Sequence, residues 1–310
     1  MIKRPLKNEG GMALILTILV VALLTITVFD LFHHAWIQSA LAAGFRNETK
    51  ALYAARSGQM AARLILIEDA KKNIPQDTLD EEWAQGTIPI PFDDDEYVFV
   101  SIQDQSGKFN LNLLTSDRGY PQQRWIKIFR RLLENLDLDP NLSDAVVDWL
   151  DANHEPLPAG AEDGYYASIE KPYSAKNGKL DSVDELFMVK GFTPKVMKKL
   201  SPYVTAWSDG KINVNTAPPV LLASLDEDMT EEMARAIVRA RAMKPFRNPV
   251  DVKRVPGVAE VYPKIALSIG ARSSFFSVVS SATFGETTKI VRAVYRRSAS
   301  GTEKKYYRVF

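Results

Sequence analysis

The chain has 310 residues, of which 46% are hydrophobic and 25% charged, and its formal net charge is +1. A net charge this close to zero excludes a global field that would attract nucleic acid or an acidic substrate. There are no cysteines, which excludes disulfides, thiolate catalysis and zinc sites built on thiolates. The length allows two folded modules in addition to a membrane anchor.

The first predicted element is an apolar run at residues 12–29, interrupted only by Thr17, Thr25 and Thr27. As a helix it would be about 27 Å long, which is just enough to cross the hydrocarbon core of a bilayer. Basic residues precede the run and none follows it directly. The positive-inside rule therefore predicts a cytoplasmic N-terminus, with the rest of the chain on the other side of the membrane.

Two simpler interpretations of this run remain. A removable signal peptide could end at the small residues 40–42, but the apolar run is longer than usual and a polar patch separates it from that site. A plain signal anchor is the second alternative. Against it, small and apolar residues recur at helical spacing between Ala51 and Ile65, and no proline occurs between Pro5 and Pro75. The pattern predicts one helix that continues to about Asp69.

A short basic leader that ends at Gly11, followed at once by a hydrophobic helix from Met12, resembles the type IV pilin and pseudopilin class. The resemblance implies that a prepilin peptidase cleaves between Gly11 and Met12 and that the new amino group is methylated. Most members carry Glu at the fifth mature position, where it pairs with the N-terminus of a neighbouring subunit. Here that position is Leu16, which suits a subunit placed first in the assembly.

Strand patterns lie at both ends of the remaining chain. Residues 71–95 are predicted to form a loop, and Tyr97 to Ile102 alternate as a strand. A C-terminal β meander is predicted at Phe275–Ser281, Thr287–Tyr295 and Tyr306–Phe310, with turns at Gly285 and Gly301. Between these regions the pattern is helical. We therefore expect an α+β, pilin-like fold, in which the long N-terminal helix packs on an antiparallel sheet that carries an inserted all-α domain.

This interpretation divides the chain into five parts. They are a prepilin leader at 1–11, the transmembrane part of the helix at 12–29, the periplasmic helix and first strands at 30–109, the inserted helical domain at 110–270, and the C-terminal meander at 271–310.

The inserted domain contains a repeat. The motif at residues 107–112, Gly-Lys-Phe-Asn-Leu-Asn, returns at 210–215 as Gly-Lys-Ile-Asn-Val-Asn. Each copy leads to an apolar-x-Gly-apolar turn, at 189–192 and at 255–258, as in helix-hairpin-helix modules. The asparagines are predicted to cap and tie the local backbone, with ligand contact as the alternative.

Helix-hairpin-helix modules often hold DNA phosphates, and the second repeat resembles the DNA-binding module of membrane-anchored competence proteins. However, residues 226–232 carry five carboxylates, which would repel phosphate. The basic residues that follow can pair with these acids instead; they are Arg235, Arg239, Arg241, Lys244 and Arg247. We expect no nucleic-acid partner, and keep a membrane-anchored DNA-binding protein as the alternative function.

An acidic loop between Asp148 and Tyr166 gives the strongest chemical signal. If Asp151 is the first position, oxygen ligands recur at the third, fifth and twelfth positions, as in a calcium loop, although Pro156 replaces the EF-hand glycine. Oxygen ligands without cysteine favour calcium over zinc or copper. The candidate ligands are Asp148, Asp151, Asn153, Glu155, Glu162 and Asp163.

Acids of this kind have two other uses, in hydrolysis and in helix capping. Paired carboxylates can perform acid–base hydrolysis, but no nucleophile-elbow, phosphate-loop or zinc-protease motif accompanies them. Alternatively, the acids cap helices and solvate a loop. Carboxylates gathered in so short a loop would repel one another unless a cation neutralised them. We therefore expect a structural calcium ion and no enzymatic activity.

The leader without a mature-position Glu, the duplicated motif, the acidic loop and the terminal meander together resemble the general secretion pathway protein K family, the large minor pseudopilins of type II secretion systems. The resemblance implies a single-pass inner-membrane protein with most of its chain in the periplasm. It implies a place at the tip of the pseudopilus, in complex with other minor pseudopilins. By position, the acids that it assigns to calcium are Asp148, Asp151, Glu155, Glu162 and Asp163.

Overall fold

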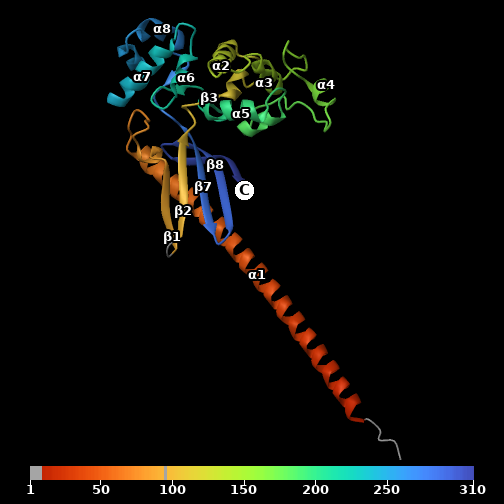
Figure 1. The fold of residues 1–310 in the computed structure, drawn as a ribbon. Helices are drawn as coiled ribbons and strands as arrows, with labels where there is room; N and C mark the ends of the chain where they lie inside the picture. Colours follow the sequence, from red (N-terminus) through yellow and green to blue (C-terminus); the bar gives the residue numbers. More distant parts are fainter. Residues whose placement is uncertain (1–8, 94–95) are drawn as a thin grey trace, which may run out of the picture.

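The computed structural model describes residues 9–93 and 96–310 (Figure 1). Its first element is α1, a helix of 63 residues from Glu9 to Lys71. The predicted continuation of the apolar run into one long helix is therefore confirmed. Among the described residues, only α1 is long and apolar enough to cross a membrane, and its apolar part is not buried in the structure. That part projects from the folded body as a stalk (Figure 1).

The remainder of α1 packs on a five-stranded antiparallel sheet with the strand order β1-β2-β7-β8-β9. The strands are β1 (Thr87–Asp93), β2 (Glu96–Asp104), β7 (Phe275–Phe284), β8 (Thr287–Ser298) and β9 (Gly301–Val309). Strands on either side of the helical insertion thus share one sheet, because β2 pairs with β7. The predicted α+β class, the strand at Tyr97–Ile102, which is part of β2, and the C-terminal meander are confirmed.

The loop predicted at residues 71–95 was wrong over much of its length. It contains a 3-10 helix, η1 (Glu82–Ala84), and the strand β1. Pro89 and Pro91 obscured the strand pattern, since proline cannot donate a ladder hydrogen bond. The structure resolves the conflict by placing β1 at the edge of the sheet, where prolines are tolerated.

Small residues let α1 approach the sheet closely. Ala51, Ala54, Ala55 and Ala62 are fully buried and belong to one core with Val98, Val100, Phe276, Val278 and Val291. Spacings of three, four and seven residues keep these alanines on one face of the helix. The stripe that was recognised in the sequence is therefore the sheet-facing side of α1.

Gly58 marks the closest approach between α1 and the sheet. A Cβ at this position would lie 2.6 Å from Val98 Cγ1 and 3.0 Å from both Val100 Cγ2 and Ser280 Cβ. Gly58→Ala should therefore cost about 1–3 kcal/mol of unfolding free energy through overpacking. Gly44→Ala is the matched control in the same helix, because nothing lies within 4 Å of its added Cβ. It should be neutral or stabilising. Equal melting temperatures for the two variants would contradict this packing.

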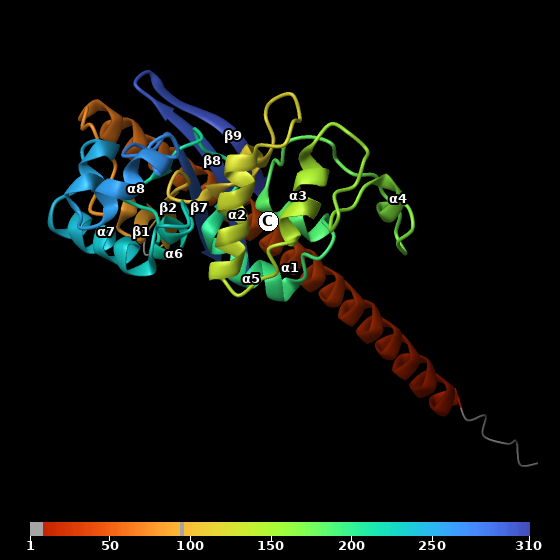
Figure 2. The ribbon, with the colours of Figure 1, turned by 90° about the horizontal axis from the view of Figure 1, so that it is seen from above.

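The helical domain lies at the far end of the sheet from the projecting stalk (Figure 1), and its two halves lie side by side (Figure 2). The first half contains β3 (Phe109–Asn110), η2 (Leu111–Leu114), α2 (Gln123–Asn135), α3 (Leu142–Leu150), α4 (Asp163–Tyr166), η3 (Val183–Met188), α5 (Pro194–Leu200), η4 (Ser201–Tyr203) and β4 (Val204–Thr205). The second contains β5 (Ile212–Asn213), α6 (Pro219–Ala223), α7 (Glu231–Met243), η5 (Pro249–Arg254), α8 (Val258–Ile265) and β6 (Ile269–Gly270). One hydrophobic core runs through both halves.

The two copies of the sequence motif occupy equivalent places in these halves. The first copy forms β3, which pairs in parallel with β4, and the second forms β5, which pairs in parallel with β6. These two-residue strands were not predicted, since no strand pattern exists at that length. Gly191 and Gly257 have positive φ values of 87° and 78° and lie between a 3-10 helix and an α-helix. The identification of these turns as helix-hairpin-helix modules stays a prediction.

The motif asparagines have the structural role that was predicted. Asn110 caps η2 by accepting from the Asn112 backbone N–H at 3.0 Å. The Asn112 amide then holds Leu180 in both directions, accepting from its N–H at 2.7 Å and donating to its carbonyl at 2.9 Å. Asn215 holds Phe246 in the same way, with both distances 2.9 Å. Each motif therefore ties together parts of its own half that are separated by helices in the sequence.

Asn215→Asp tests this role directly. The substitution keeps the shape but turns the donor to the Phe246 carbonyl into a carboxylate oxygen, in a fully buried position. We expect a loss of about 1–3 kcal/mol, the cost of an unsatisfied buried polar group, measured by chemical denaturation. Asn141→Asp is the control, because Asn141 is exposed and surface changes cost little. If Asn215→Asp and Asn141→Asp have the same free energy of unfolding, the hydrogen bonds between Asn215 and Phe246 do not stabilise the protein.

Candidate metal centre

The acidic loop joins α3 to α4 and folds back over the end of α3. Asp148 lies in the last turn of α3, Asp151 caps its C-terminus and Glu162 precedes α4. Asp151 itself is not helical, because its backbone is extended. All three side chains are nevertheless buried, with 0, 1 and 5% of their surface exposed.

The loop backbone packs directly on the Asp148 carboxylate. The Leu157 N–H donates to both of its oxygens, at 3.1 and 3.3 Å. A Cβ on Gly160 would lie 1.8 Å from Asp148 Oδ2, so only glycine fits there. Asp151 accepts from the backbone and side-chain nitrogens of Asn153, at 3.2 and 2.9 Å. By contrast, both carboxylate oxygens of Glu162 are buried without a hydrogen-bond partner.

Burial, together with the nearby charges of Asp148, Asp151 and Asp163, raises the pKa of the Glu162 carboxyl to about 7. Burial also raises the pKa of Asp148 to about 6 and that of Asp151 above its usual range. An ionised carboxylate without partners is costly in a protein interior. A hard divalent cation with oxygen ligands, such as calcium, would satisfy Glu162 and offset the repulsion. The residues therefore fit the predicted ion.

The other candidate ligands lie nearer the surface. Asn153 and Glu155 are exposed, and Asn153 Oδ1 accepts from the Glu155 N–H at 2.6 Å. Asp163 accepts from the Ala175 N–H at 2.8 Å with one oxygen, and its other oxygen lies 3.6 Å from His154 Nδ1. Asp148, Asp151 and Asp163 lie near enough to Glu162 for their charges to raise its pKa. However, no three of the four bring carboxylate oxygens within 4.8 Å of one another in the described residues, so a bound ion would have to draw them closer. The assignment of ligands stays a prediction.

Sequence analysis missed Asp144, one turn before Asp148 on α3. Asp144 is buried, accepts from Arg130 Nη2 at 2.7 Å and from the Ala159 N–H at 3.3 Å. Its spacing of four and seven residues from Asp148 and Asp151 was a signal, since such positions share a helix face. Because Arg130 pairs with it, Asp144 holds the returning loop in place.

A second acidic group was not predicted. Single carboxylate oxygens of Asp69, Asp77 and Glu81 lie within 4.8 Å of one another. Here the charge is neutralised by Arg297, whose buried guanidinium forms ion pairs with both Asp69 and Asp77. Burial, with the two neighbouring aspartates, raises the pKa of Glu81 to about 7. Arg297 therefore replaces a cation at this site.

We call Arg297, Asp69 and Asp77 the Arg297 junction, because they join three parts of the chain. Asp69 lies near the end of α1 and Arg297 near the end of β8. Asp77 accepts from the Ser273 N–H at 2.7 Å and donates its own N–H to the Ala271 carbonyl at 2.9 Å. Its carbonyl accepts from Asn213 of the second motif at 3.1 Å. The junction thus connects α1 and the sheet to the helical domain.

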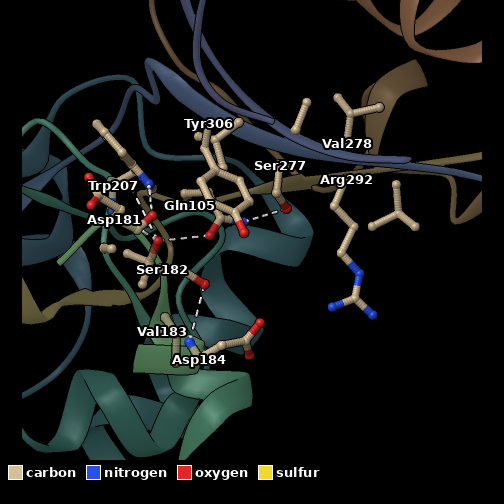
Figure 3. Close-up of a pocket in the computed structure, with 15 residues that line it drawn as sticks. Gln105, Asp181, Ser182, Val183, Asp184, Trp207, Ser277, Val278, Arg292 and Tyr306 are labelled. Carbon is tan, nitrogen blue, oxygen red and sulfur yellow. Dashed lines mark hydrogen bonds between the residues drawn. The ribbon is translucent and has the colours of Figure 1, made fainter. Parts of the chain in front are cut away.

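A cleft of about 230 Å³ lies along the seam between the sheet and the helical domain (Figure 3). Gln105 crosses this seam, accepting from Thr205 Oγ1 at 2.8 Å and donating to Ser277 Oγ at 2.7 Å. Beside it, Trp207 Nε1 donates to the Asp181 carbonyl at 2.9 Å. Side chains from both modules line the cleft, so it reflects their packing.

Some basic residues of the second half have partners within the protein. Arg241 donates to the Val214 and Ala217 carbonyls at 2.8 and 2.6 Å, and burial lowers its pKa to about 10. Arg235 pairs with Glu231. Lys264 pairs with the acids that were expected to repel phosphate, Asp226 and Asp228. Two of the five basic residues, Arg235 and Arg241, are thus held within the protein, and the absence of a nucleic-acid partner stays a prediction.

Comparison with known proteins agrees with this architecture. Family models described as type II secretion system protein K match residues 107–209 and 212–270, beginning close to the two copies of the motif. A protein of Pseudomonas aeruginosa named type II secretion system protein K is 31% identical over 95% of this chain and 91% of its own. A protein of the same name from Aeromonas hydrophila is 25% identical, over 94% of this chain and 94% of its own.

The fold also matches a solved structure. A chain in the crystal structure of the GspK-GspI-GspJ complex from the type 2 secretion system of enterotoxigenic Escherichia coli superposes with a TM-score of 0.72. It is 20% identical, and the match covers 86% of this chain and 98% of that one. Together, the family models and the curated relatives confirm the resemblance found in the sequence: this chain belongs to the type II secretion system protein K family.

Proposed function

We propose that this chain is a non-enzymatic minor pseudopilin at the tip of the type II secretion pseudopilus. In this role it initiates assembly with other minor pseudopilins and supports protein export across the outer membrane. It is anchored in the inner membrane by the apolar part of α1, and its folded body lies in the periplasm. Its partners correspond to the two proteins, GspI and GspJ, that share the crystal structure of the related complex.

The observation that carries this proposal is the position of the helical domain. It lies at the end of the sheet farthest from the membrane-spanning part of α1 (Figure 1), and it has a separate hydrophobic core of 39 buried residues. A second subunit of the same shape could not stack above it without a clash. The helical domain would therefore close the distal end of a fibre.

Leu16 supports the same position from the other end of the molecule. It is an exposed apolar residue of α1, in the place where most pilin-like subunits carry the Glu that pairs with a neighbour's N-terminus. A subunit without that charge has no need of a preceding neighbour. Only the first subunit of a fibre has no preceding neighbour.

Calcium would act as a structural ion in this subunit. Asp148, Asp151 and Glu162 would hold it, with Asp163 beside them, and its charge would offset their buried carboxylates. The ion would fix the loop between α3 and α4 against the first half of the helical domain. It would supply no chemistry beyond this neutralisation.

Processing tests the early step of this proposal. When the full chain is co-expressed with a prepilin peptidase, mass spectrometry should find a mature N-terminus at Met12 carrying one methyl group. Gly11→Val should leave the leader attached. If the wild-type chain keeps its leader under these conditions, it does not belong to the class of processed pseudopilins.

Complex formation tests the later step. The full chain, purified in detergent with the companion minor pseudopilins of its own secretion system, should elute with them as one stoichiometric complex. Separate elution of the chain from both companions would contradict the proposed tip complex.

A further inference from the structure

A cationic hollow of about 200 Å³ lies where α1 meets the edge strand β9. Arg56 and Arg63 of α1 and Lys304 of β9 all line it. No acidic side chain of the described residues lines the hollow with them. Three positive charges around so small a space repel one another and create a local field that favours an anion.

These cations are held by neutral groups. Arg63 donates to Thr302 Oγ1 at 3.0 Å, and its guanidinium lies 5.7 Å from the centre of the Tyr295 ring. Arg56 lies 5.8 Å from the Tyr53 ring, and Lys304 lies 4.7 Å from the Tyr307 ring. Within residues 9–93 and 96–310, none of the three forms an ion pair. Aromatic stacking orders the cations and leaves their charge available.

An exposed apolar stripe runs beside the hollow on α1. Tyr53, Met60 and Leu64 expose 60, 65 and 62% of their surface, and Met60 also lines the hollow. Their spacings of seven and four residues place them on one face of the helix. This face is suited to a second helix, since apolar anchors at such spacings are the usual contacts of helix docking.

We propose that this flank binds a helix of a co-assembled minor pseudopilin that carries an Asp or Glu among apolar residues. The apolar residues of that helix cover Tyr53, Met60 and Leu64, and its carboxylate enters the cationic hollow. Charge complementarity of this kind selects the partner and its register. This proposal rests on the proposed tip complex and names the surface and the partner chemistry for it.

The position along α1 excludes a membrane phosphate as the anion. The apolar run ends at Phe29, and the 27 residues from there to Arg56 extend about 40 Å as a helix. A lipid headgroup cannot reach that far from the bilayer surface. A carboxylate on the helix of another subunit, by contrast, can reach the hollow.

Charge reversal tests the hollow. Arg56→Glu combined with Lys304→Glu should weaken binding of the full chain to its purified companion minor pseudopilins at least tenfold in detergent. The matched control is Lys198→Glu with Arg239→Glu, which reverses two exposed charges on the helical domain and should change binding less than twofold. Unchanged melting temperatures establish that both variants fold. Wild-type binding should also weaken as NaCl rises from 0.05 to 0.5 M, more than binding of the hollow variant.

Crosslinking identifies the occupant. Because the chain has no cysteine, Met60→Cys can carry a single maleimide–diazirine crosslinker, with Met243→Cys, on the exposed end of α7, as the control. We expect Met60→Cys to capture a helical peptide of a companion subunit that contains Asp or Glu. A crosslink to a second copy of this chain, or to a peptide without an acid, would overturn the proposal.

The outcomes separate the two proposals. If the wild-type chain fails to bind its companions, the tip complex itself is wrong. If the wild-type chain binds and the Arg56→Glu, Lys304→Glu variant binds equally well, the tip complex stands and the cationic hollow is not its docking site.

Discussion

Removing calcium should destabilise the helical domain of the wild type, and it should reverse the sign of the stability difference between the wild type and Glu162→Gln. In excess calcium the wild type should be the more stable protein, by about 2.7 kcal/mol when the free ion is at one hundred times its dissociation constant. In chelator, Glu162→Gln should be the more stable one. The variant carries no charge where the wild type has two buried carboxylate oxygens without partners.

Glu155→Gln is the matched control for this experiment. Glu155 is in the same loop but exposed, so its substitution should preserve the calcium-dependent rise in melting temperature. Thermal melting of the three full-length chains in detergent, each with calcium and with chelator, measures all six cases. If neither the wild type nor Glu155→Gln responds to calcium, the metal site is wrong.

The same acids determine how the stability of the folded protein depends on pH. The pKa of Glu162 is raised to about 7 and that of Asp148 to about 6, so between their unfolded values and pH 7 the folded state binds more protons than the unfolded one. Stability of the metal-free protein must then fall as pH rises through this window. Calcium has to displace these protons, so the calcium-induced rise in melting temperature should be larger at pH 8 than at pH 5.5. A rise independent of pH would contradict the raised pKa values.

Arg297→Met should be the most destabilising single substitution in the sheet. It removes the guanidinium that forms ion pairs with both buried aspartates of the Arg297 junction. Asp69 keeps only the half-exposed Lys72 at 3.7 Å, and Asp77 keeps no ion pair within the described residues. Breaking a buried ion pair from one side costs about 3–5 kcal/mol. The stability of Arg297→Lys should lie between those of the wild type and Arg297→Met. Lysine keeps the positive charge but lacks the planar guanidinium that reaches both carboxylates.

The neighbouring Arg296 provides the control. It is exposed and adjacent strand positions face opposite sides of the sheet, so Arg296→Met should cost less than about 0.5 kcal/mol. Hydrogen exchange gives a second measurement, because the Ser273 N–H is held by Asp77 and should lose protection in Arg297→Met. Equal stability of the Arg296 and Arg297 variants would show that the junction does not hold the two modules together.

The long helix and the meander could be predicted because their signals are local. The alanine stripe of α1 and the alternation of β7 and β8 each lie within a dozen or so residues, and burial of one face produces that periodicity. β1 was missed for an equally local reason. Its two prolines outweigh its alternating Ile88 and Ile90, and only the edge position in the sheet makes the strand acceptable.

The candidate site was predicted in part. Clustering in sequence identified Asp148, Asp151 and Glu162, but it could not distinguish them from Asn153 and Glu155, because burial depends on how the loop returns to α3. The Arg297 junction had no sequence signal at all. Its partners are separated from Arg297 by 228 and 220 residues, and only the pairing of β7 and β8 beneath α1 brings them together.

The central claim is that this chain occupies the end of a pseudopilus, and its position on a fibre tests that claim most directly. Pseudopili assembled in the presence of the full chain carrying Met243→Cys can be labelled with maleimide gold, since the chain has no other cysteine and Met243 is exposed on the helical domain. Electron microscopy should show one gold particle per fibre, at one end only. Particles distributed along the length of the fibres would contradict the account.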